Sequence, residues 1–516
     1  MSRPRLRGAV WGLTGAAAGL AASEVPSAAS ARFPSLIGST GQWIIRHAPG
    51  GVVHSAIEAV GTADKPLLVG AVLAVVLLVG AASGALAVRR PLVFDLVAAG
   101  VAGLAWACAV SLGAGPARAL VPAVVGAASA IATRRSAVAA ASPRRRSAAD
   151  ANPATDAGLT LGPTSSRRRL FAAGAIGAGS TIAAVGAAAA LRRSGGGSTA
   201  FALPAVKDGP GHGTTGFTIP GLSPLITPTS TFYRIDEALV VPSVDPASWG
   251  LRVGGMVEAP FELSYADLLA GPLVERDITL CCVSNEVGGK LVGTARWTGV
   301  RLADLLARAG VDPAATQVVG RSVDGFSVGF PVPVALDGRN ALVAVGMNGQ
   351  PLPPRHGFPA RLIVPGLYGF TSATKWLGEI ELTTWEAFDP YWQQRGWARL
   401  APVKVSSRVD VPRDYSRVAP GRQAIAGVAW APTAGIASVA VRVDGGEWRE
   451  ARLGPSLGDD AWRQWTAEWD PEPGTHTIEV RAVTNPGLSQ TDEKRSAFPD
   501  GASGLHTSHV RVVPIT

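Results

Sequence analysis

Residues 279–285 read Thr-Leu-Cys-Cys-Val-Ser-Asn and place two adjacent cysteines, Cys281 and Cys282, at the end of an apolar run. Such a run is typical of a buried strand, and the turn after it can present a thiolate to a metal. Soft thiolate ligands suit metals that change oxidation state. The alternative is a small buried side chain, which is the commoner use of a lone cysteine. The pattern therefore nominates a metal ligand but leaves the choice open.

The sequence lacks the commoner catalytic patterns. It has no His-Glu-x-x-His, no Cys-x-x-Cys and no glycine-rich phosphate loop after a strand. Its three cysteines, of which Cys108 lies in an apolar run, do not form a disulfide framework. The histidines of the second half are scattered, which argues against a His-rich metal cluster; they are His212, His356, His476, His506 and His509.

Several blocks around the cysteines resemble, in the same order, the sulfite oxidase family of molybdopterin-dependent oxidoreductases. The turn Cys-Val-Ser-Asn at 282–285 resembles the family's Cys-Ala-Gly-Asn turn, which carries the molybdenum ligand. The other matching blocks are Phe-Tyr-Arg at 232–234, Pro-Ser-Val-Asp at 242–245, residues 295–302, residues 347–361 and Lys-Trp-Leu at 375–377. They extend from residue 232 to residue 377.

The resemblance implies a molybdenum–molybdopterin cofactor, with Cys282 as the thiolate ligand to molybdenum and as the catalytic residue. The cofactor carries a phosphate, which the planar guanidinium of arginine binds well. Gly357 and Gly366 are expected to allow close approach of the backbone. The residues expected to bind the cofactor are Tyr233, Arg234, Cys282, Asn285, His356, Arg361, Ser372 and Lys375.

Cys282 is preferred to Cys281 because Asn285 follows it by three residues, as in the family turn. Side chains alternate between the two faces of a strand. Cys281 is therefore expected to point away from the metal and to pack in the core.

The substrate stays open. Sulfite oxidases follow the Cys-Ala-Gly-Asn turn with two arginines that help to bind the anion, whereas this chain has Glu286 and Val287 there. A negative charge in place of two positive ones argues against sulfite. A related branch reduces oxidised methionine residues, but Ser284 and Thr231 depart from its pattern. Neither branch fits well.

Fold expectations follow from the pattern of short β-branched runs and turns after residue 203. Residues 204–400 are expected to form an α+β molybdopterin-binding domain, with helices at 265–270 and 302–309 and strands at 318–319, 326–330, 341–345 and 361–364. Residues 401–516 resemble the immunoglobulin-like β-sandwich that follows in sulfite oxidases, where it mediates dimers. Trp462, Trp465 and Trp469 are expected to build its core.

The first 198 residues differ in composition from the rest. They hold 19 basic and 6 acidic residues, a net charge of +13, so the positive net charge of the whole chain, +9, comes from this part. The arginines flank apolar runs instead of forming one basic face, which favours membrane topology over nucleic-acid binding. An all-α transmembrane bundle is expected, with helices in 1–133 and a last helix at 170–191. The five expected spans are residues 8–22, 67–88, 96–115, 119–133 and 170–191.

Charge placement gives the orientation, because cytoplasmic segments are rich in arginine. The N-terminus, Arg89–Arg90 and residues 134–169 are expected inside, and residues 32–65 form an outer loop. Five spans then place the hinge at 192–203 and the catalytic domain outside the cytoplasmic membrane, although Arg192 and Arg193 oppose this. A signal peptide is the alternative for residues 8–22.

Residues 134–169 are an Arg-rich linker that ends in Ser-Ser-Arg-Arg-Arg-Leu-Phe at 165–171. This ending resembles a twin-arginine export signal. The alternative is a plain block of cytoplasmic arginines before a helix.

These observations favour a membrane-anchored molybdopterin-dependent oxidoreductase that transfers an oxygen atom or two electrons on a small or sulfur-containing substrate outside the membrane. The alternatives are a non-catalytic binding or assembly protein, a methionine-sulfoxide-type reductase and a transporter. The spans hold few ionisable residues, which argues against transport. Membrane lipid, a homodimer partner and an electron acceptor or donor are the expected partners. No haem or flavin motif identifies the electron partner.

Overall fold

The computed structural model describes residues 3–30, 33–49, 52, 64–112, 114–141, 202–210 and 215–513. The chain divides into two compact units. One comprises Met1–Thr199 with Ala238–Val240, and the other comprises Ala200–Glu237 with Val241–Thr516.

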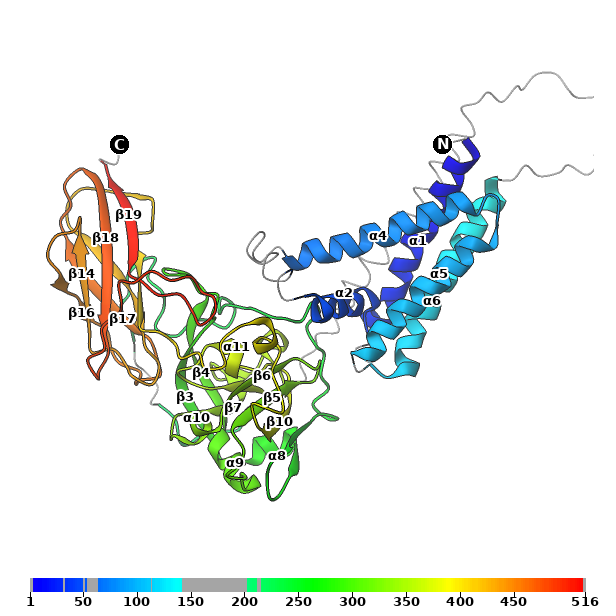
Figure 1. Ribbon diagram of the computed structural model, residues 1–516. Helices are drawn as coiled ribbons and strands as arrows, with labels where there is room; N and C mark the ends of the chain where they lie inside the picture. Colours follow the sequence, from blue (N-terminus) through cyan, green and yellow to red (C-terminus); the bar gives the residue numbers. More distant parts are fainter. Residues whose placement is uncertain are drawn as a thin grey trace, which may run out of the picture. The chain divides into compact units, whose positions relative to one another are not determined.

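The described part of the first unit is helical (Figure 1). Its helices are α1 (Arg3–Ala29), α2 (Leu36–His47), α4 (Asp64–Leu86), α5 (Leu92–Ser111) and α6 (Pro116–Ala141). Within these residues, three segments are long and apolar enough to cross a membrane: Lys65–Leu86, Leu92–Ser111 and Pro116–Ala139.

Glycines bring α1 close to α4 and α6. A Cβ added to Gly12 of α1 would lie 2.0 Å from the Gly80 carbonyl oxygen of α4, and one added to Gly15 would lie 2.8 Å from the Ala130 oxygen of α6. Large apolar side chains such as Leu78 and Leu96 are exposed on the outside. Small residues inside and apolar residues outside are typical of helices that pack within lipid.

The expected spans at 67–88, 96–115 and 119–133 correspond to α4, α5 and α6. Helix α6 continues to Ala141, into the first residues of the expected linker. Residues 8–22 lie within α1, which is not among the three candidate spans. The expected span at 170–191, the linker from 142 to 169 and the hinge up to 201 lie outside the described residues.

The second unit begins with two sheets. One has the strand order β2-β1-β10-β5-β6, in which β1 and β10 pair in parallel and the other neighbours antiparallel. Its strands are β1 (Gly250–Gly255), β2 (Phe261–Ser264), β5 (Gln317–Ser322), β6 (Ser327–Pro331) and β10 (Leu377–Thr383).

The other sheet is antiparallel in the order β3-β4-β7-β8, with β9 also paired to β7. It comprises β3 (Leu273–Cys281), β4 (Val292–Arg301), β7 (Leu342–Met347), β8 (Gln350–Pro351) and β9 (Arg361–Ile363). Both sheets contribute to one apolar core, which includes Leu251, Phe330 and Leu362.

Short helices connect these strands. They are α8 (Tyr265–Ala270), α9 (Leu302–Ala309), α10 (Val332–Leu336), α11 (Gly369–Ser372) and the 3-10 turns η3 (Pro354–His356) and η4 (Gln393–Arg395). The helices expected at 265–270 and 302–309 are confirmed, because α8 and α9 have these bounds. Ser264 caps α8 by accepting from the Asp267 amide, while Asp267 accepts from the Ser264 amide. The mixed α+β character expected from the sequence is confirmed.

The C-terminal region is rich in β-structure and lies in orange and red in Figure 1. One sheet has the order β11-β13-β17-β16 and the other β12-β19-β18-β14-β15. Their strands are β11 (Ser406–Val411), β12 (Ser416–Val418), β13 (Gln423–Trp430), β14 (Ser438–Val443), β15 (Arg449–Glu450), β16 (Arg452–Leu453), β17 (Arg463–Trp469), β18 (Gly474–Val483) and β19 (His506–Val512). The two sheets share one apolar core.

The expected role of the three tryptophans holds for two of them. Trp465 and Trp469 lie in the core between the two C-terminal sheets. Trp462 lies instead in a cluster with Cys281 and Tyr368 of the preceding domain. Its indole donates to the Leu225 carbonyl at 2.7 Å and its amide to the Thr279 hydroxyl at 2.6 Å. Trp462 stands just before β17 and outside that strand, so its side chain is not directed into the core between the sheets. Its hydrogen bonds instead join the C-terminal region to β3.

Candidate cofactor site

The loop between β3 and β4 holds Cys282 in a fixed turn. The Cys282 amide donates to the Leu291 carbonyl at 2.9 Å, and the Asn285 amide donates to the Cys282 carbonyl at 3.0 Å. The buried Asn285 side chain accepts from the Leu291 amide at 2.7 Å. Asn285 thus closes the loop on itself, which explains why an asparagine stands three residues after the cysteine. Cys282 is partly exposed, and burial raises the pKa of its thiol while hydrogen bonds with Ser284 lower it.

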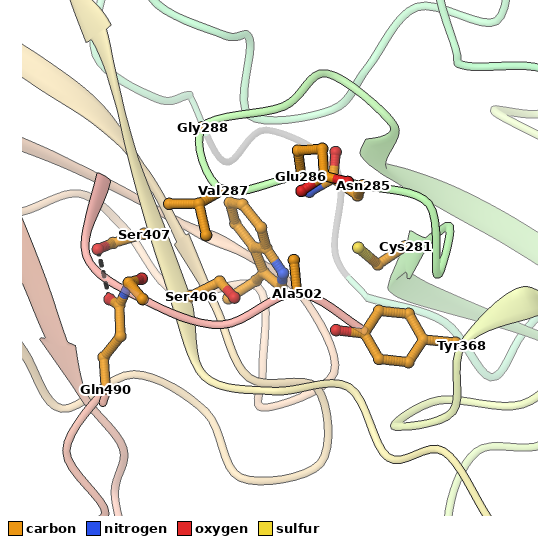
Figure 2. Close-up of a pocket in the computed structure, with 12 residues that line it drawn as sticks. Cys281, Asn285, Glu286, Val287, Gly288, Tyr368, Ser406, Ser407, Gln490 and Ala502 are labelled. Carbon is orange, nitrogen blue, oxygen red and sulfur yellow. Dashed lines mark hydrogen bonds between the residues drawn. The ribbon is translucent and has the colours of Figure 1, made fainter. Parts of the chain in front are cut away.

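Cys281 points elsewhere. It is 2% exposed and packs with Val283, Tyr368 and Trp430. Figure 2 shows its sulfur between Asn285 and the ring of Tyr368, beside a cavity of about 10 Å³ that Ser406 and Gln490 also line. The expectation that Cys281 packs in the core is therefore confirmed. The role of Cys282 as metal ligand stays a prediction, and it has the exposure that this role needs.

One buried basic side chain, that of Arg361, lies near Tyr233, which also lies near Cys282. Arg361 at the start of β9 is 6% exposed, its Nη1 donates to the His356 carbonyl at 3.1 Å, and its guanidinium stacks 5.1 Å from the Trp297 ring centre. Burial lowers the pKa of Arg361 to about 10. Its buried Nε finds no hydrogen-bond partner among the residues that the structure describes. A buried donor without a partner is costly, so this atom is suited to an anionic ligand.

His356 and Tyr233 lie in the same neighbourhood. His356 is buried and its Nε2 lies 3.2 Å from the Thr229 carbonyl oxygen. Burial, and then the charge of Arg361, lower the pKa of His356 to about 4, so this imidazole is neutral at physiological pH. Burial raises the pKa of Tyr233, and the nearby Cys282 raises it further while Arg361 lowers it. The structure therefore brings Tyr233, His356, Arg361 and Cys282 together.

Arg234 and Lys375 share an acidic partner that sequence reasoning missed. Both form ion pairs with Asp236, whose side chain is 3% exposed. The Lys375 ammonium also donates to the Ile235 carbonyl at 3.0 Å. An acidic residue two positions after Arg234 was the available sequence signal. The sequence could not show that Lys375, which lies 139 residues further along, reaches the same carboxylate.

Ser372 and the two glycines lie less directly at the site. The buried Ser372 hydroxyl donates to the Tyr368 carbonyl at 3.2 Å, four residues earlier, so it bonds back within its own short helix. Gly357 has φ +108° and its α-carbon faces Lys375, where a Cβ would come within 3.0 Å. Gly366, with φ +82°, faces Thr433 and Arg339. The structure shows close approach of Gly366 to protein side chains, and Gly357 lies beside Lys375, one of the expected site residues.

The C-terminal region holds the loop after Cys282 from the other side. Arg408 of β11 donates from Nη1 to the Gly289 carbonyl at 2.5 Å and from Nη2 to the Ser223 hydroxyl at 2.9 Å. The ring of His506 lies against Gly288, where an added Cβ would be 2.2 Å away. His506 Nδ1 accepts from the Val409 amide at 3.0 Å. Sequence reasoning gave neither residue a role, because both lie more than 100 residues after the loop.

Comparison with known proteins identifies the class. The family model described as an oxidoreductase molybdopterin binding domain matches residues 238–392. The chain is 30% identical over 350 residues to mitochondrial sulfite oxidase of Rattus norvegicus, covering 56% of this chain and 62% of that protein. It is 30% identical to sulfite oxidase of Gallus gallus, covering 52% and 68%. An uncharacterised oxidoreductase, YuiH of Bacillus subtilis, is 35% identical over 153 residues, covering 30% and 74%.

A solved structure agrees with the fold. The sulfane dehydrogenase SoxCD of Paracoccus pantotrophus superposes with a TM-score of 0.51 at 23% identity, covering 56% of this chain and 82% of that chain. The chain spans 62% of the length of the rat relative and 52% of the human mitochondrial sulfite oxidase. The chain belongs to the sulfite oxidase family of molybdopterin-dependent oxidoreductases, and the family implies a molybdenum–molybdopterin cofactor.

The residues present fit such a cofactor. The thiol of Cys282 is a suitable soft ligand at the end of a strand. The unpartnered Nε of Arg361 is a donor for an anion such as the pterin phosphate. Both features lie in the segment that matches the family model.

The choice between the two cysteines can be tested by matched substitutions. We expect Cys282→Ser to fold but to lose at least about 100-fold in turnover, since a hydroxyl is a poor ligand for a soft metal. Cys281→Ser is the control, and should keep most of its activity because this side chain only packs. Molybdenum content, unfolding temperature and turnover would be measured together. Loss of activity in Cys281→Ser with retention in Cys282→Ser would reverse the assignment.

The contact of His506 with Gly288 predicts a pH dependence of stability. Burial and the charge of Arg408 lower the pKa of His506 in the folded protein, with Asp410 and Asp414 opposing. As pH falls below the ordinary histidine value of about 6.5, the unfolded chain takes up a proton that the folded chain refuses. Stability from this group is therefore present at neutral pH and decreases on acidification.

His506→Asn keeps an acceptor for the Val409 amide. We expect the unfolding temperature of this variant to fall by less than that of the wild type when the pH is lowered from about 7 to about 5. Thermal unfolding across this range checks the difference. Parallel curves for the two proteins would show that His506 does not contribute.

Proposed function

We propose that this protein is a membrane-anchored molybdopterin-dependent oxidoreductase that transfers an oxygen atom or two electrons on a small, sulfur-containing substrate outside the cytoplasmic membrane. The observation that carries the proposal is the buried Arg361, whose Nε has no hydrogen-bond partner among the described residues and which lies with Tyr233 near the Cys282 turn of a sulfite oxidase-type domain.

The residues divide the work in the proposed site. Cys282 ligates molybdenum, and Arg361, Arg234 and Lys375 supply positive charge for the pterin phosphate. Tyr233 and the neutral His356 are close enough to contribute hydrogen bonds. Asn285 holds the Cys282 turn, and Ser372 holds the short helix before Lys375. When bound, the cofactor supplies the two-electron oxygen-atom chemistry, and the protein binds and orients it.

The proposed substrate is not sulfite. Glu286 is exposed and Val287 lies next to it at the edge of the loop, so this loop presents a negative charge where the family places two arginines. Like charge disfavours an approaching dianion. A neutral sulfur compound, such as a sulfoxide or thioether, avoids this penalty and matches the chemistry that molybdopterin enzymes perform.

Membrane attachment is the second element of the proposal. The apolar surfaces of α4, α5 and α6 support insertion into lipid. With α1 and residues 170–191 as further spans, the arginine distribution places the N-terminus inside and the catalytic domain outside. In this arrangement residues 134–169 form the cytoplasmic linker and 192–203 the hinge, and 204–400 and 401–516 are the two domains beyond the membrane. The two-sheet C-terminal region is proposed to be immunoglobulin-like and to form the homodimer contact.

Substrate selectivity can be tested directly. We expect purified protein that contains molybdenum and pterin to oxidise sulfite at least about 100-fold less efficiently than it reduces a simple sulfoxide, because Glu286 repels the dianion. Glu286→Gln and Glu286→Arg should raise sulfite turnover in that order, with Glu450→Gln as a surface control. Efficient, saturable sulfite oxidation by the wild type would defeat the substrate proposal. Absence of molybdenum and pterin from the preparation would defeat the enzyme proposal.

The route to the outside can be tested through Arg168 and Arg169. A pterin cofactor is inserted in the cytoplasm, so a loaded domain must cross the membrane folded. Replacing both arginines by lysine keeps the charge but removes the guanidinium pair that a twin-arginine route reads. We expect this variant to leave the catalytic domain inside, protected from protease added to intact cells. An Arg89→Lys, Arg90→Lys variant is the control, and export of a loaded domain from both variants would refute the signal.

A further inference from the structure

Asp236 holds two of the cations expected to bind the cofactor. Its carboxylate forms ion pairs with the Arg234 guanidinium and with the Lys375 ammonium. The Asp236 side chain is 3% exposed and that of Lys375 12%, whereas Arg234 is 40% exposed. A buried carboxylate between two cations stabilises a site that would otherwise collect unbalanced positive charge.

The same neighbourhood holds positive charge that Asp236 does not match. Arg361 is buried with its Nε unpartnered among the described residues, while its Nη1 donates to the His356 carbonyl and its guanidinium lies over the Trp297 ring. The charges of Arg361, Arg355 and Arg234 all act on His356. Arg234 and Lys375 thus have a protein carboxylate, Asp236, as their counter-ion, whereas Arg361 Nε has no acceptor among the described residues.

A carboxylate and a phosphate make the same demands on these groups. Both present oxygen acceptors that guanidinium and ammonium donors bind at similar distances. An anionic ligand that uses Arg234 and Lys375 must therefore compete with Asp236 for their hydrogens. A ligand that reaches Arg361 meets a donor that is already free of protein acceptors.

We propose that Asp236 is a built-in counter-ion that occupies Arg234 and Lys375 in the cofactor-free protein and yields these cations to the phosphate of the incoming cofactor. The proposal rests on the proposed function, since it takes the same residues to be the cofactor site. Asp236 acts through Arg234 and Lys375, so it is a positioning residue. Asp236 stabilises the arrangement of Arg234 and Lys375 before the cofactor binds. It also lowers the affinity of the site for any other anion, which must displace its carboxylate.

The test uses the full chain in detergent, purified from cells that make no molybdopterin, with inorganic phosphate as the probe. Asp236→Asn keeps the size of the side chain and removes the competing charge. We expect the variant to unfold at a lower temperature than the wild type without phosphate, because Arg234 and Lys375 lose their counter-ion. We also expect it to bind phosphate about tenfold more tightly by calorimetry. Phosphate should therefore raise its unfolding temperature more than that of the wild type.

Asp277→Asn is the matched control. Asp277 is a fully buried carboxylate of the same domain, and it forms a two-pronged pair with Arg296. Its loss should lower stability without changing phosphate affinity. A purely structural role for Asp236 predicts the same behaviour as in this control, so equal phosphate affinity in Asp236→Asn and the wild type would overturn the proposal.

Two further results also have a defined meaning: a variant that does not fold alone, and a wild type that contains no cofactor. If Asp236→Asn does not stay folded alone, stabilisation by phosphate supports the proposal and a failure of phosphate to stabilise it overturns the proposal. Asp236→Ser, which also removes the charge, serves as a second variant. The wild type made in cells that supply the cofactor distinguishes failure of the counter-ion role of Asp236 from failure of the proposed function. If the wild type contains the cofactor and Asp236→Asn binds phosphate no more tightly, only the counter-ion role is wrong. If the wild type contains no cofactor, both the counter-ion role and the proposed function are wrong.

Discussion

Burial of positive charge is the constraint around which the catalytic domain is arranged. Arg361 sits at the start of a three-residue strand with its guanidinium against Trp297, where water does not reach its Nε. A desolvated cation costs several kcal/mol unless an anion or a set of acceptors balances it. Asp236 supplies part of this balance for Arg234 and Lys375, and the remainder is left for a ligand.

The Cys282 turn depends on a second arrangement, in which two regions far apart in sequence meet at one loop. Asn285 and Leu291 close the loop from within, while Arg408 and His506 hold Gly289 and Gly288 from the C-terminal region. Trp462 fixes the same region to β3 through Thr279 and Leu225. The C-terminal β-rich region therefore contributes to the shape of the site, beyond any role in association with another subunit.

The helical unit follows different physics. Glycines such as Gly12 and Gly15 lie where its helices meet, and leucines such as Leu78 and Leu96 are exposed, the reverse of a soluble core. Three of these helices, α4, α5 and α6, contain segments long and apolar enough to cross a membrane.

The sequence by itself determined the family, the positions of α8 and α9, the apolar helices and the thiol at the end of β3, because these depend on local patterns and on motifs in a fixed order. It also separated Cys281 from Cys282, since side chains alternate on a strand. Only the tertiary structure decided that Asp236 joins Arg234 to Lys375 and that Gly366 faces Thr433. It also decided that Trp462 packs against the preceding domain and not in the core between the two C-terminal sheets. Those contacts join residues that are distant in sequence, and a pairing between distant side chains leaves no periodic trace in either segment.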